Sequence, residues 1–147
     1  GTGFQQDLTG RENIRLQSSI YGRSKSETLE LEEEVIEFSG IREFIDDPIR
    51  TYSAGMKARL GFAIISSLDP EILLLDEVMS VGDYEFRKKS RARIEELVKG
   101  DATVVIVSHS KSILNNLCSK VYAIDNGSVM THGDIDEAFE FYESEKA

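Results

Sequence analysis

Two short, continuous apolar runs with a helical segment between them constrain the fold of this chain more than any other feature. The runs are Ile72–Leu75 and Thr103–Val107, and apolar residues at helical spacing fill the interval over about 84–99. Runs of this length are typical of strands that are buried on both faces of a parallel sheet. Because two parallel strands need a crossover connection, usually a helix, the sequence predicts an α/β arrangement here.

The residues before the first run predict helices. Apolar residues recur there at intervals of three and four, which indicates one helix after Thr9, a second after Ser26 and a third over about 55–68. The sequence therefore predicts a helical subdomain over 1–68, followed by a β-α-β half of an α/β core over 69–147. That core is expected to be a mainly parallel sheet with flanking helices.

The last third of the chain predicts a short helix, a hairpin and a final helix. The short helix contains Ile113 and Leu117, and the final amphipathic helix contains Phe139 and Tyr142 on its apolar face. Between them, Asn126-Gly127 separates two apolar segments, and Asn-Gly suits the left-handed positions of a tight hairpin turn.

Composition excludes several classes of protein. The chain has 147 residues and a formal net charge of -10, which argues against broad electrostatic binding to nucleic acid or anionic lipid. One cysteine, Cys118, and two histidines leave no disulfide framework and no Cys/His metal cluster. No apolar run is long enough to span a bilayer. We therefore expect a cytoplasmic protein with no nucleic-acid partner and no direct membrane insertion.

The acidic pair Asp76-Glu77 directly follows the first apolar run. Ligands of open α/β sheets bind beyond the carboxyl ends of the strands. There, Asp76 could hold the Mg²⁺ of a nucleotide, usually through water, and Glu77 could polarise an attacking water as a general base. The alternative interpretation is a strand that ends at the surface with two solvated acids.

Small residues open the third helix, in the segment Tyr52-Ser53-Ala54-Gly55-Met56. The N–H groups and positive dipole end of a helix N-terminus attract phosphate, and the hydroxyl of Ser53 adds a donor. The alternative is an ordinary helix cap, since serine is among the commonest N-cap residues.

Two further signals follow the apolar runs. His109 comes just after the second run, where a histidine can donate to a phosphate oxygen or orient a water. Ser80-Val81-Gly82-Asp83 lies shortly after the first run and otherwise reads as a turn before a helix. A lone histidine is more often structural, and His132 and Cys118 are interpreted as structural residues.

The order of these segments resembles the ATP-binding cassette (ABC) ATPases. The family's Leu-Ser-Gly-Gly-Gln signature resembles Tyr52–Met56, its Walker B strand resembles Ile72–Glu77, its D-loop resembles Ser80–Asp83, and its switch histidine matches His109. Within the family, these segments and Leu8–Asn13 are most similar to ATPase subunits that export polysaccharide, O-antigen or teichoic acid.

The resemblance implies a partial P-loop NTPase fold with ATP and Mg²⁺ as cofactors. It implies catalytic roles for Glu77 and His109 and a metal role for Asp76. The nucleotide contacts it implies are Ser53, Ala54, Gly55, Met56 and Asp83. It further implies a head-to-tail homodimer of ATPase subunits and a membrane-spanning permease that holds them at the inner face of the membrane.

The P-loop of this family is not found in the sequence. That loop requires Gly-x-x-x-x-Gly-Lys-Ser/Thr, and the chain contains no Gly-Lys dipeptide. We therefore expect the C-terminal part of an ABC ATPase, without a following carbohydrate-binding domain, that does not hydrolyse ATP alone. One alternative is a non-catalytic partial cassette that binds a partner. A chromosome-maintenance ABC ATPase ranks last, because no heptad run is present.

Overall fold

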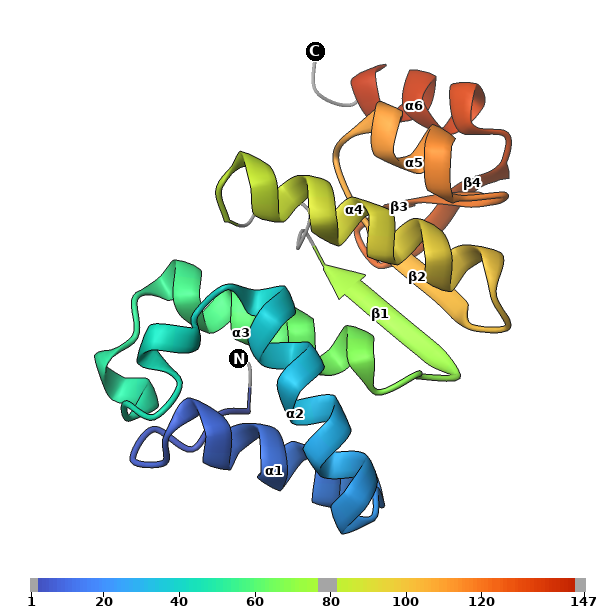
Figure 1. Cartoon of the computed structure of the whole chain (residues 1–147). Helices are drawn as coiled ribbons and strands as arrows, with labels where there is room; N and C mark the ends of the chain where they lie inside the picture. The colour runs from blue at the N-terminus through green and yellow to red at the C-terminus, as the bar shows by residue number, and fades with distance from the viewer. Residues whose placement is uncertain (1–2, 77–81, 145–147) are drawn as a thin grey trace. The chain divides into compact units, whose positions relative to one another are not determined.

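The computed structural model describes residues 3–76 and 82–144, and it has the α/β architecture of a partial P-loop NTPase fold. Figure 1 shows the helices and strands along the chain. In order, they are α1 (Gly10–Ile20), α2 (Lys25–Ser39), the 3-10 turns η1 (Arg42–Phe44) and η2 (Ile49–Thr51), α3 (Ala54–Ser67), β1 (Ile72–Asp76), α4 (Tyr84–Lys99), β2 (Thr103–Val107), α5 (Lys111–Leu117), β3 (Val121–Asp125), β4 (Ser128–Gly133) and α6 (Ile135–Ser144). Every predicted helix and strand is present.

The chain forms two compact units. The first consists of the described residues within 1–73 and 78–103, and the second of those within 74–77 and 104–147. α4 therefore belongs to the same unit as the three preceding helices. The predicted subdomain boundary at residue 68 remains a prediction.

The helices of the first unit begin at well-defined caps. The side chain of Thr9 accepts from the backbone of Glu12, and the Glu12 carboxylate accepts in return from the backbone of Thr9. Ser24 and Glu27 form the same capping box on α2, so this helix begins before the predicted Ser26. Reciprocal capping satisfies backbone donors that a helix N-terminus otherwise leaves unpaired.

An apolar core and an ion cluster hold α1, α2 and α3 together. The fully buried core residues are Ile14, Val35, Ile36, Ile49, Leu60 and Ala63. Beside this core, the carboxylate of Glu32 on α2 accepts from Arg11 at 2.5 Å and from Arg15 at 2.6 Å, both on α1. Arg11 also pairs with Asp46 at 2.7 Å. The two arginines and two carboxylates balance in charge, which allows Glu32 to be buried.

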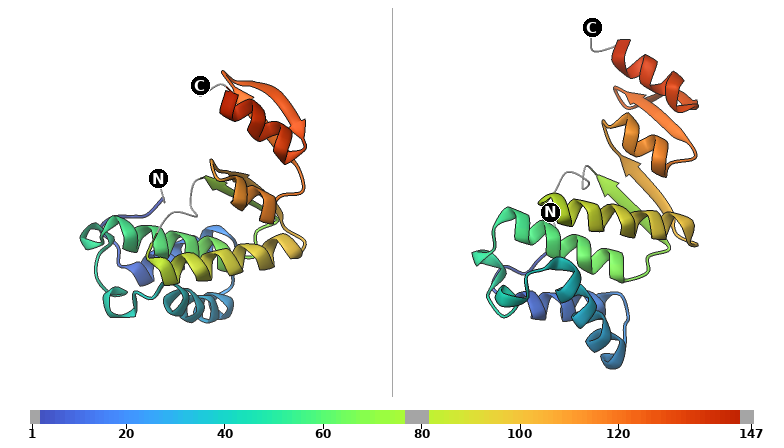
Figure 2. Two further views of the ribbon diagram at one scale, coloured as in Figure 1. Left: turned by 90° about the horizontal axis from the view of Figure 1, so that it is seen from above. Right: turned by 45° about the horizontal axis from the view of Figure 1, so that its top comes forward.

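Three phenylalanines join α4 to this helical core. Phe38 of α2, Phe62 of α3 and Phe86 of α4 have ring centroids 5.8–6.0 Å apart in every pair. Such tilted and edge-to-face rings are favourable beyond the area they bury. α3 and α4 accordingly lie side by side in both views of Figure 2.

The second unit contains the predicted hairpin and the last two helices. β3 and β4 pair in antiparallel fashion, and the turn residues Asn126 and Gly127 both have positive φ, at 45° and 78°. This is the geometry that favours Asn-Gly. α6 packs on the hairpin (Figure 2), and Leu114, Val121, Ala138 and Phe139 form a small core.

The prediction that both apolar strands are buried on both faces is wrong for the described residues. In β1, Leu73 and Leu75 are buried, whereas the alternating Ile72 and Leu74 are 64% and 72% exposed. In β2, every second residue from Thr103 to Val107 is likewise exposed. Strand side chains alternate between faces, and in each strand the described residues of one face are exposed. A continuous apolar run records that both faces are apolar, not that both are covered.

Candidate functional site

Ser53 caps the first helix that the sequence marked as functional. It has extended backbone angles, and its hydroxyl oxygen accepts from the backbone N–H of Met56 at 3.2 Å. The Lys57 N–H donates to the Ser53 carbonyl at 3.0 Å, so the regular helical bonds begin there. A hydroxyl that accepts one bond still has its own proton to donate. The cap and the phosphate-binding interpretations of Ser53 are therefore compatible.

The N–H groups of Ala54 and Gly55 precede the first intrahelical bond of α3, where the helix dipole is positive. A Cβ added to Gly55 would contact only the Ser53 hydroxyl oxygen, at 3.9 Å, and the backbone φ of Gly55 is not positive. Packing within the described chain therefore does not require glycine at this position. The missing side chain keeps the backbone at the start of α3 open to a close-lying ligand.

Tyr52 fixes the loop that leads into this helix. Its side chain is buried, and its hydroxyl donates to the carbonyl of Phe44 at 2.5 Å. Burial raises the pKa of Tyr52 to about 12. The hydroxyl also lies against Gly10, the first residue of α1, where any Cβ would collide with it and with Ile45. Tyr52 thus connects the loop before Ser53 to the start of α1.

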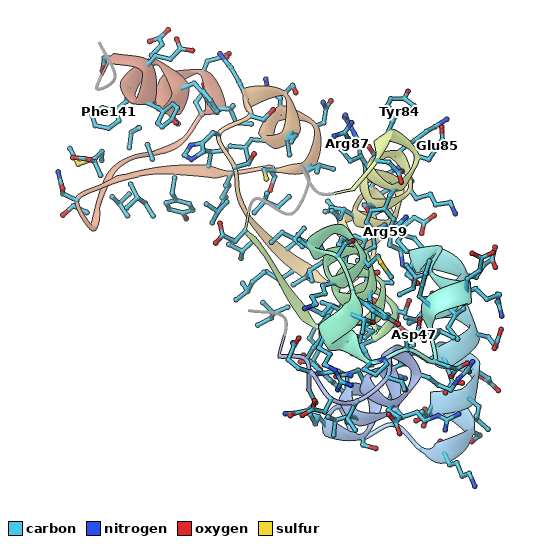
Figure 3. The ribbon with its side chains drawn as sticks, turned by 90° about the vertical axis from the view of Figure 1, so that its left-hand side faces the viewer. Asp47, Arg59, Tyr84, Glu85, Arg87 and Phe141 are labelled. Atoms are coloured by element: carbon cyan, nitrogen blue, oxygen red, sulfur yellow. The ribbon has the colours of Figure 1, made fainter. Side chains whose placement is uncertain are left out.

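Asp83 lies in the same unit and caps α4. Its carboxylate accepts from the backbone N–H of Phe86 at 2.9 Å and lies 3.6 Å from the guanidinium of Arg59 on α3. The Phe86 hydrogen bond, together with Arg59, holds the pKa of Asp83 below its usual value. Figure 3 labels Arg59 on α3 together with Tyr84 and Glu85 in the first turn of α4. The structure therefore brings the start of α4 next to the helix that Ser53 caps.

The second unit contains Asp76 and His109. Asp76 is the last residue of β1, and His109 follows the end of β2 by two residues. β1 and β2 are neighbours in a small parallel sheet, so their carboxyl ends lie at the same edge. Both side chains are exposed there.

His109 contacts a residue that the sequence did not mark as functional. Its Nδ1 lies 2.7 Å from the hydroxyl of Tyr142 on α6, and the two rings stack with centroids 5.6 Å apart and planes inclined by 19°. The sequence placed Tyr142 only on the apolar face of a helix. Its spacing from neighbouring apolar residues predicts burial, but nothing local predicts a partner 33 positions earlier. The Arg59–Asp83 pair was missed for the same reason.

Glu77, the predicted general base, lies outside the described residues, as do Ser80 and Val81 of the predicted D-loop. Across the two described ranges, no group of three or more His, Cys, Asp or Glu residues could hold a metal. Mg²⁺ usually keeps several waters and binds to proteins through one or two carboxylates. Asp76 supplies one such carboxylate at the end of β1, and its role as a metal ligand stays a prediction.

The fold is that of a partial P-loop NTPase, an α/β class of protein. The sequence matches the ABC transporter family over residues 2–80, which is more than half of the chain. The chain belongs to the ABC transporter family. A solved structure of an ATP-binding subunit of an ABC transporter superposes with a TM-score of 0.79 at 22% identity, covering 98% of this chain and 60% of that one. At this identity the likeness shows the fold alone.

Curated relatives include the O-antigen export system ATP-binding protein RfbB of Klebsiella pneumoniae, which is 42% identical over 147 residues. The teichoic acids export ATP-binding protein TagH of Shouchella clausii is 41% identical over 141 residues. The chain spans 60% of the length of the first and 39% of the second. Among the helices that the structure describes, none is both long and apolar enough to cross a membrane.

Proposed function

We propose that this chain is part of the ATP-hydrolysing subunit of an ABC exporter for a polysaccharide or a polyol-phosphate glycan. The observation that carries the proposal is the start of α3. Ser53 caps it, the amides of Ala54 and Gly55 lie at its positive end, and no packing inside the described chain requires Gly55. An anion-binding helix terminus explains this combination, and the similarity to O-antigen and teichoic acid exporters favours a glycan as the transported substrate.

Each site residue has a role in this proposal. Ser53, Ala54, Gly55 and Met56 form a loop that lies against the phosphates of ATP, where the Ser53 hydroxyl and the N–H groups of Ala54 and Gly55 are the donors, since the Met56 N–H is bonded to Ser53. Asp83, the cap of α4, is a further nucleotide contact. Asp76 would hold Mg²⁺, and Glu77 would act as general base toward the attacking water. His109 donates to the transferring phosphate. Bound Mg²⁺ would neutralise charge that develops on the phosphates.

The proposal includes a second cassette, as the resemblance to ABC ATPases implies. Two cassettes would pair head to tail, and each signature loop would contact the nucleotide held by the opposite P-loop. The helical part over 1–68 would dock on a membrane-spanning permease, which would hold the protein at the inner face of the cell membrane. Residues 69–147 would belong to the ATPase core. This chain alone would not hydrolyse ATP.

Glu77→Gln in the protein that carries the complete cassette tests the catalytic proposal. Turnover of ATP should be abolished while ATP binding persists, because glutamine keeps the shape of glutamate but is not a base. Glu30→Gln, at an exposed position of α2, is the matched control and should leave turnover unchanged. Undiminished hydrolysis in Glu77→Gln would refute the role of Glu77.

A second candidate, a partial cassette that binds a partner without catalysis, is favoured by the lack of a Gly-Lys dipeptide. The two candidates differ in what accompanies this chain. A P-loop encoded immediately upstream and in frame would eliminate the non-catalytic candidate. A stop codon or an unrelated domain at that position would favour it.

A further inference from the structure

A contact that the sequence did not predict joins α6 to the loop after β2. Tyr142 on α6 contacts His109 through its hydroxyl, at 2.7 Å from Nδ1, and through a nearly parallel ring stack. The phenol therefore restricts both the rotation of the imidazole and the chemistry of its Nδ1.

Neighbouring contacts fix α6 in place. Lys111, at the start of α5, forms an ion pair with Asp136 of α6 at 2.7 Å, and its ammonium lies 5.8 Å from the centroid of the Phe139 ring. Phe139 in turn packs edge-to-face against Tyr142 with centroids 5.9 Å apart. These three residues of α6 lie on one helical face, since they are three positions apart. α6 consequently presents Tyr142 to His109 from a defined position.

We propose that Tyr142 is a positioning residue for His109: its phenol O–H donates to Nδ1 and so keeps the imidazole proton on Nε2. In a neutral imidazole one nitrogen donates and the other accepts, so a donor at Nδ1 selects the tautomer with Nε2–H. The significance of that tautomer rests on the proposed function. Phosphate oxygens are acceptors, and only a protonated Nε2 can donate to them.

The opposite arrangement, with Nδ1–H donating to the phenol oxygen, would leave Nε2 as an acceptor. An acceptor lone pair facing a phosphate oxygen is repulsive. The two arrangements share the same heavy-atom distance, and nitrogen NMR distinguishes them because the protonated and bare ring nitrogens have very different shifts.

The first test uses this chain, labelled with ¹⁵N and measured at alkaline pH. His132 is the other histidine, so a His132→Gln variant assigns the two ring systems. We expect the His109 shifts of a single Nε2–H tautomer in the wild type, and ring-nitrogen shifts that move away from those values in Tyr142→Phe. This variant keeps the ring and its packing on Phe139. Tyr21→Phe, at an exposed tyrosine, is the matched control and should leave the His109 shifts unchanged.

A wild-type spectrum with the proton on Nδ1 would overturn the proposal. Wild-type shifts that persist in Tyr142→Phe would overturn it equally. Neither result depends on hydrolysis of ATP.

The second test measures turnover in the protein with the complete cassette. Tyr142→Phe should lower kcat for ATP about 10-fold, in the range seen when a residue that orients a functional histidine is removed, with KM changed less than about 2-fold. Tyr142→Phe with unchanged kcat would contradict the positioning role in catalysis. If the wild type itself does not hydrolyse ATP, the proposed function fails. The NMR result still shows whether Tyr142 donates to Nδ1 of His109.

Discussion

The helical unit and the strand-containing unit bury their apolar residues to different degrees. In the helical unit, Ile14, Ile36 and Leu60 are completely inaccessible to solvent, and helix caps and ion pairs surround them. In the second unit, Ala138 is the most buried core residue, at 3% exposed, while Val105 and Val107 on β2 are 49% and 55% exposed. The first unit thus completes its own core, whereas β2 in the second unit has apolar residues that stay exposed among the described residues.

Because of this difference, packing within the chain explains the residues of the helical unit but not the exposed apolar residues of β2. Contacts within the helical unit account for its residues in detail. Ser53 caps α3, and any side chain at Gly10 would collide with Tyr52. The exposed face of β2 has no such explanation within the described residues. Large exposed apolar surfaces on soluble domains normally contact other polypeptide. The stability of the chain should therefore depend mainly on the helical unit.

The largest expected effect is the loss of a side chain from the helical core. Leu60→Ala should lower the free energy of unfolding of the helical unit by about 3 kcal/mol, because it removes buried methyl groups and leaves a cavity. Hydrogen exchange of the α1–α3 amides, or urea unfolding followed by circular dichroism, measures the change.

Val105→Ala is the matched truncation on the exposed face of β2 and should cost less than about 0.5 kcal/mol. Equal losses of unfolding free energy in the two variants would show that the two units are equally well packed, which would contradict the difference in burial described above.

A somewhat smaller effect is expected at the ion cluster. Glu32→Gln should destabilise the helical unit by about 2 kcal/mol at neutral pH, less than for a fully buried pair because Arg15 is half exposed. Burial alone raises the pKa of Glu32, but hydrogen bonds from Arg15 and Arg11 outweigh it and hold the pKa below its usual value.

The pH dependence follows from that direction. A carboxylate with a lowered pKa in the folded state stabilises the protein above its unfolded pKa, near 4, and this stabilisation is lost as the pH falls through the folded pKa. Unfolding measured between neutral and acidic pH should show a smaller acid-induced loss in Glu32→Gln than in the wild type. Glu30→Gln should retain the wild-type slope. Identical slopes in all three proteins would remove Glu32 as the cause.

The smallest effect on stability is expected on the uncovered strand face. Val107→Thr should change the free energy of unfolding by less than about 0.5 kcal/mol, since Val107 is 55% exposed. If this face associates with other copies of the chain, the same change should weaken concentration-dependent association in sedimentation experiments. A loss of several kcal/mol would mean that the face is covered within the chain.

The sequence predicted local structure well because local structure has local causes. Asn126-Gly127 predicted its hairpin through the positive φ values that both residues adopt. The apolar spacing that indicated a helix over about 55–68 predicted the end of α3 to within a residue. Serine at position 53 indicated a helix start, and the structure confirms that it caps α3.

Long-range features could not be predicted in the same way. Apolar periodicity reports which residues avoid water but not which polypeptide covers them, so burial of both faces of β1 and β2 was wrongly expected. The contacts Tyr142–His109 and Arg59–Asp83 join residues distant in sequence, and only the fold places them together. For the candidate site, sequence order indicated the residues, while their hydrogen-bond partners came from the structure.

The most direct test of the account is a calorimetric titration of Mg-ATP into this chain. The main phosphate anchor of the proposed site lies in a P-loop, which the sequence of this chain does not contain. We therefore expect no saturable binding, even though Ser53, Asp76 and His109 are present. Saturable binding that is lost in Asp76→Ala would contradict the account, because it would show that these residues form a complete nucleotide site by themselves.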